Sequence, residues 1–391
     1  MKFYGLDDFD FCGKRVLVRV DFNVPLSGGK ITDDLKIKKG LTTIHYILQK
    51  QPSQLIMISH LGRPEGKYVA EMSLKPVAQR VSELLDRPVA LANDCLSDVP
   101  EDEIVLMENL RFHTEEEAND EKFAKKLASC AELYVNDAFG TAHRAHASNN
   151  AVTRFLPSCA GHLMQKEIEN LSKALYPKHP YVAIVGGAKA DKITFIRELG
   201  QHADKLLFGG VLANTVLKAI GTDIGSSLYD KETLGTAKKL YADLGKKIVL
   251  PVDAVVANKF SDDAESKIVD VGNIPNGWLI LDIGPKTIAL FKAELEKAKT
   301  ITWTGCIGVF EFARFAKGTE ELAEFLAESE AVTIIGGGDS AASIEKYQLE
   351  DKMTHIGTGG GATLDYLGGK ELPALTALEE NFAKFSRVKE Q

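Results

Sequence analysis

The feature that most constrains the fold is a repeated alternation of short, β-branched apolar runs with longer segments of helical periodicity. Each run is almost continuously apolar, as expected for strands buried on both faces, and such strands occur mainly in parallel sheets covered by helices. Two sets of runs therefore predict two three-layer α/β domains in series. The first set is Val16–Val20, Leu55–Ser59, Ile104–Met107 and Leu133–Asn136; the second is Tyr181–Val185, Lys205–Phe208, Lys247–Leu250, Leu279–Leu281, Thr300–Trp303 and Val332–Ile335.

The length of the chain, 391 residues, also favours two domains, because single hydrophobic cores rarely grow to this size. A segment of helical periodicity, Met164–Leu175, ends at Tyr176-Pro177 and is predicted to be a linker helix. We expect an N-terminal domain over residues 1–165, a linker over 166–178, a C-terminal domain over 179–368 and a tail over 369–391. The tail should pack back near the hinge or the first domain through an apolar stripe of Leu375, Leu378, Phe382 and Phe385.

Net charge and cysteine usage narrow the class of protein. The formal net charge of −8 argues against non-specific binding to nucleic acid, so any anion site must be local. No stretch has the length of a membrane span, and the first ten residues do not resemble a secretory signal. Five scattered cysteines, none in a C-x-x-C pair, are typical of reduced thiols. We expect a cytoplasmic monomer with neither nucleic-acid nor membrane partners.

Polar and basic residues directly follow the predicted strands of the first half. In a parallel sheet the carboxyl ends of the strands share one edge, so these loops should meet in one crevice. Several guanidinium groups there would bind a small anion carrying carboxylate or phosphate. The alternative is that each arginine pairs with a neighbouring acid at the surface. The loops are Asp21-Phe22-Asn23, His60-Leu61-Gly62-Arg63, Arg111-Phe112-His113 and His143-Arg144-Ala145-His146.

Two nearby patterns have simpler interpretations. His143 and His146 are spaced to share a helix face, but no cysteine or acidic cluster nearby completes a zinc site. The acidic run Glu115–Glu117 is predicted to be the solvated start of a helix.

The second half carries glycine-rich turns where the first carries arginine. Glycine lets backbone N–H groups approach an anion, and a following helix N-terminus favours phosphate, although glycine also serves tight turns. Lys189 and Lys192 would share a helix face pointing at the phosphates, and Asp339 is either a helix N-cap or a ligand of a metal–nucleotide complex. Neither the P-loop nor the dinucleotide-binding pattern is present. The turns are Gly186-Gly187, Gly209-Gly210, Gly336-Gly337-Gly338 and Gly359-Gly360-Gly361.

Eight motifs, in order along almost the whole chain, resemble those of the phosphoglycerate kinase family. They are VRVDFNVP (Val18–Pro25), SHLGRP (Ser59–Pro64), ENLRFH (Glu108–His113), VNDAFGTAHRAH (Val135–His146), GGAK (Gly186–Lys189), GVFE (Gly308–Glu311), IIGGGDS (Ile334–Ser340) and TGGGA (Thr358–Ala362). The resemblance implies two Rossmann-like α/β domains with parallel sheets, joined by the linker helix and facing a cleft. It also implies reversible phosphoryl transfer between 1,3-bisphosphoglycerate and ADP, giving 3-phosphoglycerate and ATP, with Mg²⁺ accompanying the nucleotide.

The resemblance also implies roles for individual residues. The acid would be held by Asp21, Phe22, Asn23, Lys36, His60, Leu61, Gly62, Arg63, Arg111 and Arg144. The nucleotide would be held by Lys189, Lys192, Glu311, Gly337, Gly338, Asp339 and Ser340, with Asp339 on Mg²⁺. Lys36, Lys192, Gly360 and Gly361 would act on the phosphoryl group in transfer. Positioning and charge neutralisation of this kind are what phosphoryl transfer requires of a protein.

The chain departs from the family pattern at four places. Lys36 stands where the family has arginine, and it lacks the planar fork that can contact two oxygens. Ala190 alone separates Lys189 from Asp191, which shortens the lysine segment by one residue. Thr304 and Cys306 replace asparagine and proline, and Val211 replaces a glycine.

Two other functions are compatible with parts of the pattern. A binding protein that keeps the kinase fold with reduced or lost turnover would follow from Lys36 and the shortened lysine segment. A dinucleotide-dependent oxidoreductase would follow from the strand–helix rhythm, but its glycine fingerprint is absent.

Overall fold

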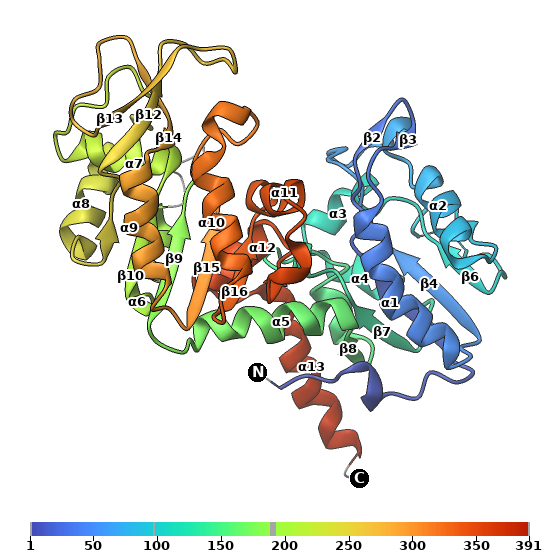
Figure 1. Cartoon of the computed structure of the whole chain (residues 1–391). Coiled ribbons are helices and arrows are strands. Elements are labelled where there is room, and N and C mark those ends of the chain that lie inside the picture. The colour runs from blue at the N-terminus through green and yellow to red at the C-terminus, as the bar shows by residue number, and fades with distance from the viewer. Residues whose placement is uncertain (1, 97, 188–192, 390–391) are drawn as a thin grey trace. The chain divides into compact units, whose positions relative to one another are not determined.

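The computed structural model describes residues 2–96, 98–187 and 193–389, and its elements are shown in Figure 1. The chain divides into two compact units. Unit 1 consists of Met1–Ile168 with Glu371–Gln391, and unit 2 of Glu169–Lys370. The chain passes between the units twice, once within helix α5 (His162–Leu175) and once after residue 370.

Unit 1 is built on a six-stranded sheet in the order β5-β6-β4-β1-β7-β8, with every neighbouring pair parallel. Four of the strands are the predicted runs, and β5 and β8 are short additions at the edges. The strands are β1 (Arg15–Arg19), β4 (Gln54–Ile58), β5 (Ala90–Leu91), β6 (Ile104–Leu106), β7 (Leu133–Asn136) and β8 (Ser158–Ala160), beside a hairpin of β2 (Leu26–Ser27) and β3 (Lys30–Ile31).

Strand β1 shows how unit 1 obtains three layers. Val16 and Val18 pack with the apolar stripes of α1 and α2, whereas Leu17 packs on the opposite face with α4. Side chains alternate along a strand, so a run that is apolar at every position must be covered on both faces. The helices of unit 1 are α1 (Leu35–Gln49), α2 (Lys75–Leu85), α3 (Thr114–Glu117), α4 (Glu121–Ala128) and α13 (Pro373–Lys389), with 3₁₀ turns η1 (Leu6–Asp8), η2 (Ala70–Met72), η3 (Leu110–Phe112), η4 (Phe139–Thr141) and η5 (Ala151–Arg154).

The predicted tail forms helix α13, which packs on unit 1. Leu375 and Leu378 are buried, while Phe382 and Phe385 contact the cluster that also contains the α1 side chains. The buried Asn381 accepts a hydrogen bond from Ser158 N (2.9 Å) and donates to the carbonyl of Leu156 (2.7 Å). The last helix is therefore an integral part of the N-terminal unit.

Unit 2 has a second parallel six-stranded sheet, in the order β11-β10-β9-β15-β16-β17. One face packs on α9, α10 and α11, with the fully buried Trp303 among them, and Leu206 and Gly200 bring α6 and α8 against the other face. Two parallel-sheet α/β domains were predicted, and this fold class is confirmed. The strands are β9 (Tyr181–Val185), β10 (Lys205–Phe208), β11 (Ile248–Val249), β15 (Thr300–Thr304), β16 (Val332–Gly336) and β17 (His355–Ile356).

The remaining elements of unit 2 include one correction to the sequence analysis. The run at Leu279–Leu281 belongs to β14 (Leu279–Ile283), which pairs antiparallel with β12 (Asp253–Ala257) in a separate sheet that β13 (Ser266–Asp270) completes. Leu279 and Ile280, the first two residues of β14, are only half-buried. A short apolar run therefore did not distinguish a strand of this antiparallel sheet from a strand of the parallel sheet. The helices are α6 (Ile193–His202), α7 (Gly210–Ala219), α8 (Leu234–Leu244), α9 (Pro285–Leu295), α10 (Lys317–Ala327), α11 (Gly338–Lys346) and α12 (Gly361–Leu367), with turns η6 (Ala313–Phe315) and η7 (Glu350–Lys352).

Among the described residues, every helix is too short or too polar to cross a lipid bilayer.

Candidate active site

The basic loops of unit 1 follow four consecutive strands of its sheet: β6, β4, β1 and β7. Because the strands are parallel, their carboxyl ends lie at one edge of the sheet, and loops that are far apart in the sequence come together there. Asn23 Oδ1 accepts a hydrogen bond from Gly62 N (3.0 Å), and Arg111 donates to the Gly62 carbonyl (2.7 Å). Loops after β1, β4 and β6 are thus tied together around Gly62.

Lys36 reaches this edge from the first turn of α1. Its Nζ lies 2.9 Å from Asp21 Oδ2, and the Asp21 side chain is only 10% exposed. The Lys36 side chain remains 38% exposed, so its ammonium group can contact both Asp21 and a solvent-borne anion.

Arg19 is a fully buried arginine that the sequence analysis did not single out. It lies on β1 and donates from Nη2 to Nδ1 of His60 over 3.2 Å. Arginine has no acceptor, so His60 Nδ1 must accept and the neutral ring carries its hydrogen on Nε2. Burial, reinforced by the charge of Arg19, holds the pKa of His60 well below its usual value. His60 therefore offers a neutral N–H donor to the site.

A chain of buried hydrogen bonds holds the Arg19 side chain in place. Arg19 Nε donates to Ser148 Oγ (2.8 Å), and Ser148 Oγ donates to Glu116 Oε1 (2.6 Å). Glu116 also accepts from Ser148 N (2.9 Å) and is fully buried. The prediction that Glu115–Glu117 is a solvated helix start is wrong for Glu116, because its carboxylate balances the buried Arg19 charge. An arginine inside the otherwise apolar run VLVRV was the signal for this pair.

The loop after β7 adds further positive charge. Arg144 donates from Nε to His143 Nε2 over 3.2 Å, and Arg144 and Arg111 both contribute to the field at His146. Burial and these charges lower the pKa of His146 to about 3, so His146 is neutral. The Arg63 side chain is exposed and, within the described residues, makes no hydrogen bond or ion pair. We call Arg19, Lys36, His60, Arg111, Arg144 and His146 the basic cluster.

In unit 2, two of the glycine turns serve backbone packing. Gly187 N donates to the Cys306 carbonyl (2.8 Å) and Gly210 N donates to the Ile307 carbonyl (3.0 Å). A Cβ at Gly186 would lie 2.2 Å from the Cys306 carbonyl oxygen, so a side chain there is sterically excluded. The amides of Gly187 and Gly210 are therefore occupied, and the glycines permit the close approach of neighbouring turns.

The glycine turn before α11 leaves its helix N-terminus open. Gly337 is the N-cap with φ 92°, a conformation that favours glycine, and the first N–H groups of a helix have no partner within it. Asp339 is exposed in the first turn, so the alternative in which it is the N-cap is wrong. Ser340 is buried, and its Oγ donates to the Gly336 carbonyl (2.5 Å). Gly360 similarly precedes α12, of which Gly361 is the first residue.

A cavity of about 270 Å³ lies within unit 2, beside these turns. It is lined mainly by apolar side chains, with Glu311 and Asp339 among the polar ones. Of the departures from the family pattern, Val211 and Cys306 line the cavity, whereas Thr304 is buried at the end of β15. Cys306 Sγ lies 3.3 Å from the Asp339 carbonyl, which joins this turn to the start of α11. A mostly apolar lining with a few polar groups is typical of a small-molecule site.

The predicted site residues Lys189 and Lys192 lie outside the described residues. Their neighbours Gly187 and Ile193 bound the segment, which follows β9 and precedes α6.

Comparison with known proteins identifies the relatives of this chain. A family model described as Phosphoglycerate kinase matches residues 6–370. The phosphoglycerate kinases of Dictyoglomus turgidum and Moorella thermoacetica are each 50% identical to the chain, and both alignments cover 96% of the chain and 98% of the relative. Among solved structures, phosphoglycerate kinase from Coxiella burnetii superposes with a TM-score of 0.90 at 40% identity, covering 97% of this chain and 99% of that one. The enzyme from Pyrococcus horikoshii superposes at 0.84 with 34% identity, covering 98% and 100%.

Proposed function

The chain belongs to the phosphoglycerate kinase family, which makes it a phosphotransferase acting on phosphoglycerate and a nucleotide, and we propose that the loops at the carboxyl edge of the unit 1 sheet hold the phosphoglycerate. The observation that carries this assignment is that Arg63, Arg111 and Arg144 follow three strands at one edge of the sheet and Lys36 reaches the same edge from α1, in a protein of net charge −8. Asp21, Asn23, His60, Arg63, Arg111 and Arg144 would contact the carboxylate, hydroxyl and 3-phosphate, assisted by Phe22, Leu61 and Gly62 of the same loops.

We propose that Arg19 positions this site from beneath. It is fully buried and holds His60 through Nδ1, so it would orient the Nε2–H donor without itself reaching the solvent. Ser148 and Glu116 keep Arg19 in place and compensate its charge.

The nucleotide would occupy the cavity of unit 2. Its apolar lining suits the base, the exposed Glu311 would bind ribose hydroxyls, and the N-terminus of α11 at Gly337–Ser340 would face the phosphates. Ser340 is buried and its Oγ donates to Gly336, so the N–H groups of the exposed Gly338 and Asp339 are the ones that would meet phosphate. Lys189, Lys192, Gly360 and Gly361 remain the predicted contacts of the transferring group.

The carboxylate of Asp339 fits a role as a magnesium ligand. It is exposed, it lines the cavity, and it is a hard oxygen donor of the kind Mg²⁺ prefers. One carboxylate suffices, since Mg²⁺ bound to nucleotides takes its other ligands from phosphate and water. Mg²⁺ would neutralise charge on the phosphates during transfer.

In the reaction, a terminal oxygen of the ADP β-phosphate attacks the phosphorus of the acyl phosphate. The bond from that phosphorus to the carboxyl oxygen breaks, leaving 3-phosphoglycerate as the carboxylate and ATP as the second product. Lys36 and Lys192 would balance the charge spread over the phosphoryl oxygens. Because the two proposed substrate sites lie on different units, we propose that the units approach one another for transfer, with the segment 166–178 as hinge.

A coupled assay of ATP formation, run alongside binding titrations of 3-phosphoglycerate and ADP, tests this function. We expect turnover, and we expect Arg111→Ala to raise the KM for phosphoglycerate by more than about 10-fold, as the loss of a charge-assisted contact does. Arg87→Ala is the matched control, because Arg87 pairs with Glu103 at the surface. Nucleotide binding without turnover at saturating substrates would instead favour the non-catalytic alternative.

We also propose a cytoplasmic, monomeric enzyme. The five cysteines are all free thiols, which is the usual state in a reducing compartment.

A further inference from the structure

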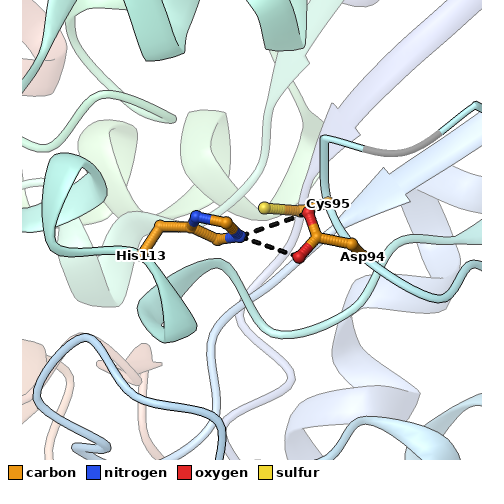
Figure 2. Close-up of side chains that lie close together, drawn as sticks. All are labelled: Asp94, Cys95 and His113. Carbon is orange, nitrogen blue, oxygen red and sulfur yellow. Dashed lines mark hydrogen bonds and ion pairs between the residues drawn. The ribbon is translucent and has the colours of Figure 1, made fainter.

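Asp94, Cys95 and His113 bring three metal-ligating side chains together in unit 1 (Figure 2). One ligand atom of each lies within 4.8 Å of the others. Asp94 and Cys95 come from the loop after β5, and His113 directly follows η3, so two separate loops supply the group. We propose that these residues form a binding site for Zn²⁺ or a similar divalent cation that accepts sulfur and nitrogen ligands.

The three side chains are already oriented toward one another. His113 Nε2 lies 2.9 Å from Asp94 Oδ2 and 3.2 Å from Oδ1, and Figure 2 shows the Cys95 sulfur beside the same edge of the ring. Asp94 Oδ1 also accepts from Leu96 N (2.7 Å), which fixes the carboxylate. The His113 ring packs against Phe123, with ring centres 5.5 Å apart. Little rearrangement is therefore needed to place an ion among them.

Tetrahedral zinc would require small shifts of these side chains. Zinc–nitrogen and zinc–oxygen bonds of about 2.0–2.2 Å and zinc–sulfur bonds of about 2.3 Å place ligand atoms roughly 3.3–3.8 Å apart. A bound ion would therefore replace the hydrogen bond between His113 and Asp94 and lengthen that separation by about half an ångström. The Asp94 side chain is 44% exposed and the His113 side chain 25%, so solvent can supply a fourth ligand.

The kinds of ligand select the ion. Thiolate and imidazole favour Zn²⁺ and Co²⁺ over Mg²⁺ and Ca²⁺, which prefer oxygen. The site therefore differs in chemistry from the proposed magnesium ligand Asp339. Burial and the neighbouring Asp94 carboxylate raise the pKa of the Cys95 thiol, so binding of the ion must displace the thiol proton to solvent. The resulting thiolate and the Asp94 carboxylate together neutralise the divalent cation. The ion would pin the loop after β5 to the turn that carries Arg111.

Cobalt provides the direct test, because a Co²⁺–thiolate bond gives a charge-transfer absorption band in the near ultraviolet. The full-length protein is treated with a chelator, freed of it, and titrated with Co²⁺. We expect a band that saturates at one equivalent, disappears on adding Zn²⁺, and persists in excess Mg²⁺. Absence of the band, or its persistence in Cys95→Ser, would overturn the proposal.

Matched variants separate the site from other thiols and from loss of folding. Cys12→Ser and Cys130→Ser, at an exposed and a half-buried cysteine elsewhere, should keep the band. Asp94→Asn retains the acceptor for Leu96 N and should fold, as circular dichroism would check, yet bind Co²⁺ more than about 10-fold more weakly. Unchanged affinity in a folded Asp94→Asn variant would contradict the ligand set.

Hydrogen exchange tests whether the bound ion links the loop after β5 to the turn that carries Arg111. With Zn²⁺ bound, amides of residues 92–96 and 110–117 should exchange more slowly in the wild type, and not in Cys95→Ser. Equal exchange with and without Zn²⁺ would contradict a link between the loops.

Discussion

At the scale of single residues, the site of unit 1 depends on how buried charges are compensated. Arg19 and Glu116 are both fully buried, and Ser148 connects them through two hydrogen bonds of 2.8 and 2.6 Å. An uncompensated buried charge is strongly destabilising, so these residues must be placed together. The same arginine donates to Nδ1 of His60, so the neutral His60 ring carries its hydrogen on Nε2. The Lys36 side chain is 38% exposed and pairs with Asp21, so unlike the fully buried Arg19 it can also contact an anion from solvent.

Lys36 is the residue whose substitution tests charge stabilisation most directly. Lys36→Ala should lower kcat by on the order of 100-fold, the effect of removing one stabilising donor from a transition state. Lys36→Arg should retain or raise kcat, because arginine keeps the charge and adds a planar fork. Steady-state kinetics of ATP formation measure both. Lys38→Ala, on the same helix but paired with Asp34, is the control and should leave kcat unchanged. Indifference of kcat to both Lys36 variants would remove Lys36 from the mechanism.

At the scale of elements, helices α5 and α13 are fixed by buried polar contacts with loops distant in sequence. Asp137 Oδ1 accepts from Leu163 N (2.9 Å) and Met164 N (3.2 Å) and so caps the N-terminus of α5. Tyr366 of α12 lies 2.8 Å, oxygen to oxygen, from Ser172 in the C-terminal part of α5. Asn381, within α13, likewise bonds to a distant loop, through Ser158 N and the Leu156 carbonyl.

Replacement of Asn381 should destabilise unit 1. Asn381→Ala leaves the buried Ser158 N–H and the Thr153 carbonyl without the Asn381 amide, whereas the Leu156 carbonyl keeps its hydrogen bond from Ser158 Oγ (2.8 Å). We expect the loss to cost about 3 kcal/mol of unfolding free energy. Urea denaturation followed by circular dichroism measures the loss. Lys384→Ala, an exposed substitution on the same helix, should change stability by less than about 0.5 kcal/mol. Similar losses in both variants would contradict a special role for the buried amide.

The cap of α5 should make stability depend on pH. Burial raises the pKa of Asp137 to about 7, against about 3.9 in an unfolded chain. The native state therefore holds a proton that the unfolded state has lost, so this contribution is complete below about pH 4 and declines as pH rises to about 7. The decline is on the order of 4 kcal/mol. Asp137→Asn should remove it, as measured by denaturation midpoints across this range. Parallel curves for wild type and variant would show that Asp137 does not titrate as described.

At the scale of the whole molecule, the two units differ in how the chain builds them. Unit 2 is one continuous segment, Glu169–Lys370, that contains all six strands of its sheet, whereas unit 1 needs both ends of the chain. The final helix α13 supplies Leu375, Leu378 and Asn381 to the interior of unit 1. Phosphoryl transfer needs both units, because the proposed substrate sites lie on different ones.

This difference predicts the behaviour of fragments. A fragment of residues 169–370 should fold and bind Mg-ADP without transferring a phosphoryl group, because its sheet and cavity are complete. A fragment of residues 1–168 should be much less stable than the intact unit, since it lacks α13. Circular dichroism melts and calorimetric titration with Mg-ADP measure these properties. Cooperative melting of 1–168 at the temperature of the intact protein would contradict the role of α13.

The sequence by itself determined the order and type of most elements, the loops at the strand ends and the family. These features can be predicted because hydrophobic periodicity and short motifs depend only on residues that are close together in the sequence. Only the tertiary structure decided that Glu116 is buried opposite Arg19, that the amides of Gly187 and Gly210 serve turn packing, and that β14 lies in an antiparallel sheet. It likewise brought Asp94 and Cys95 beside His113. Each of these depends on contacts between segments distant in sequence, whose distances only the packing of the sheets and helices fixes.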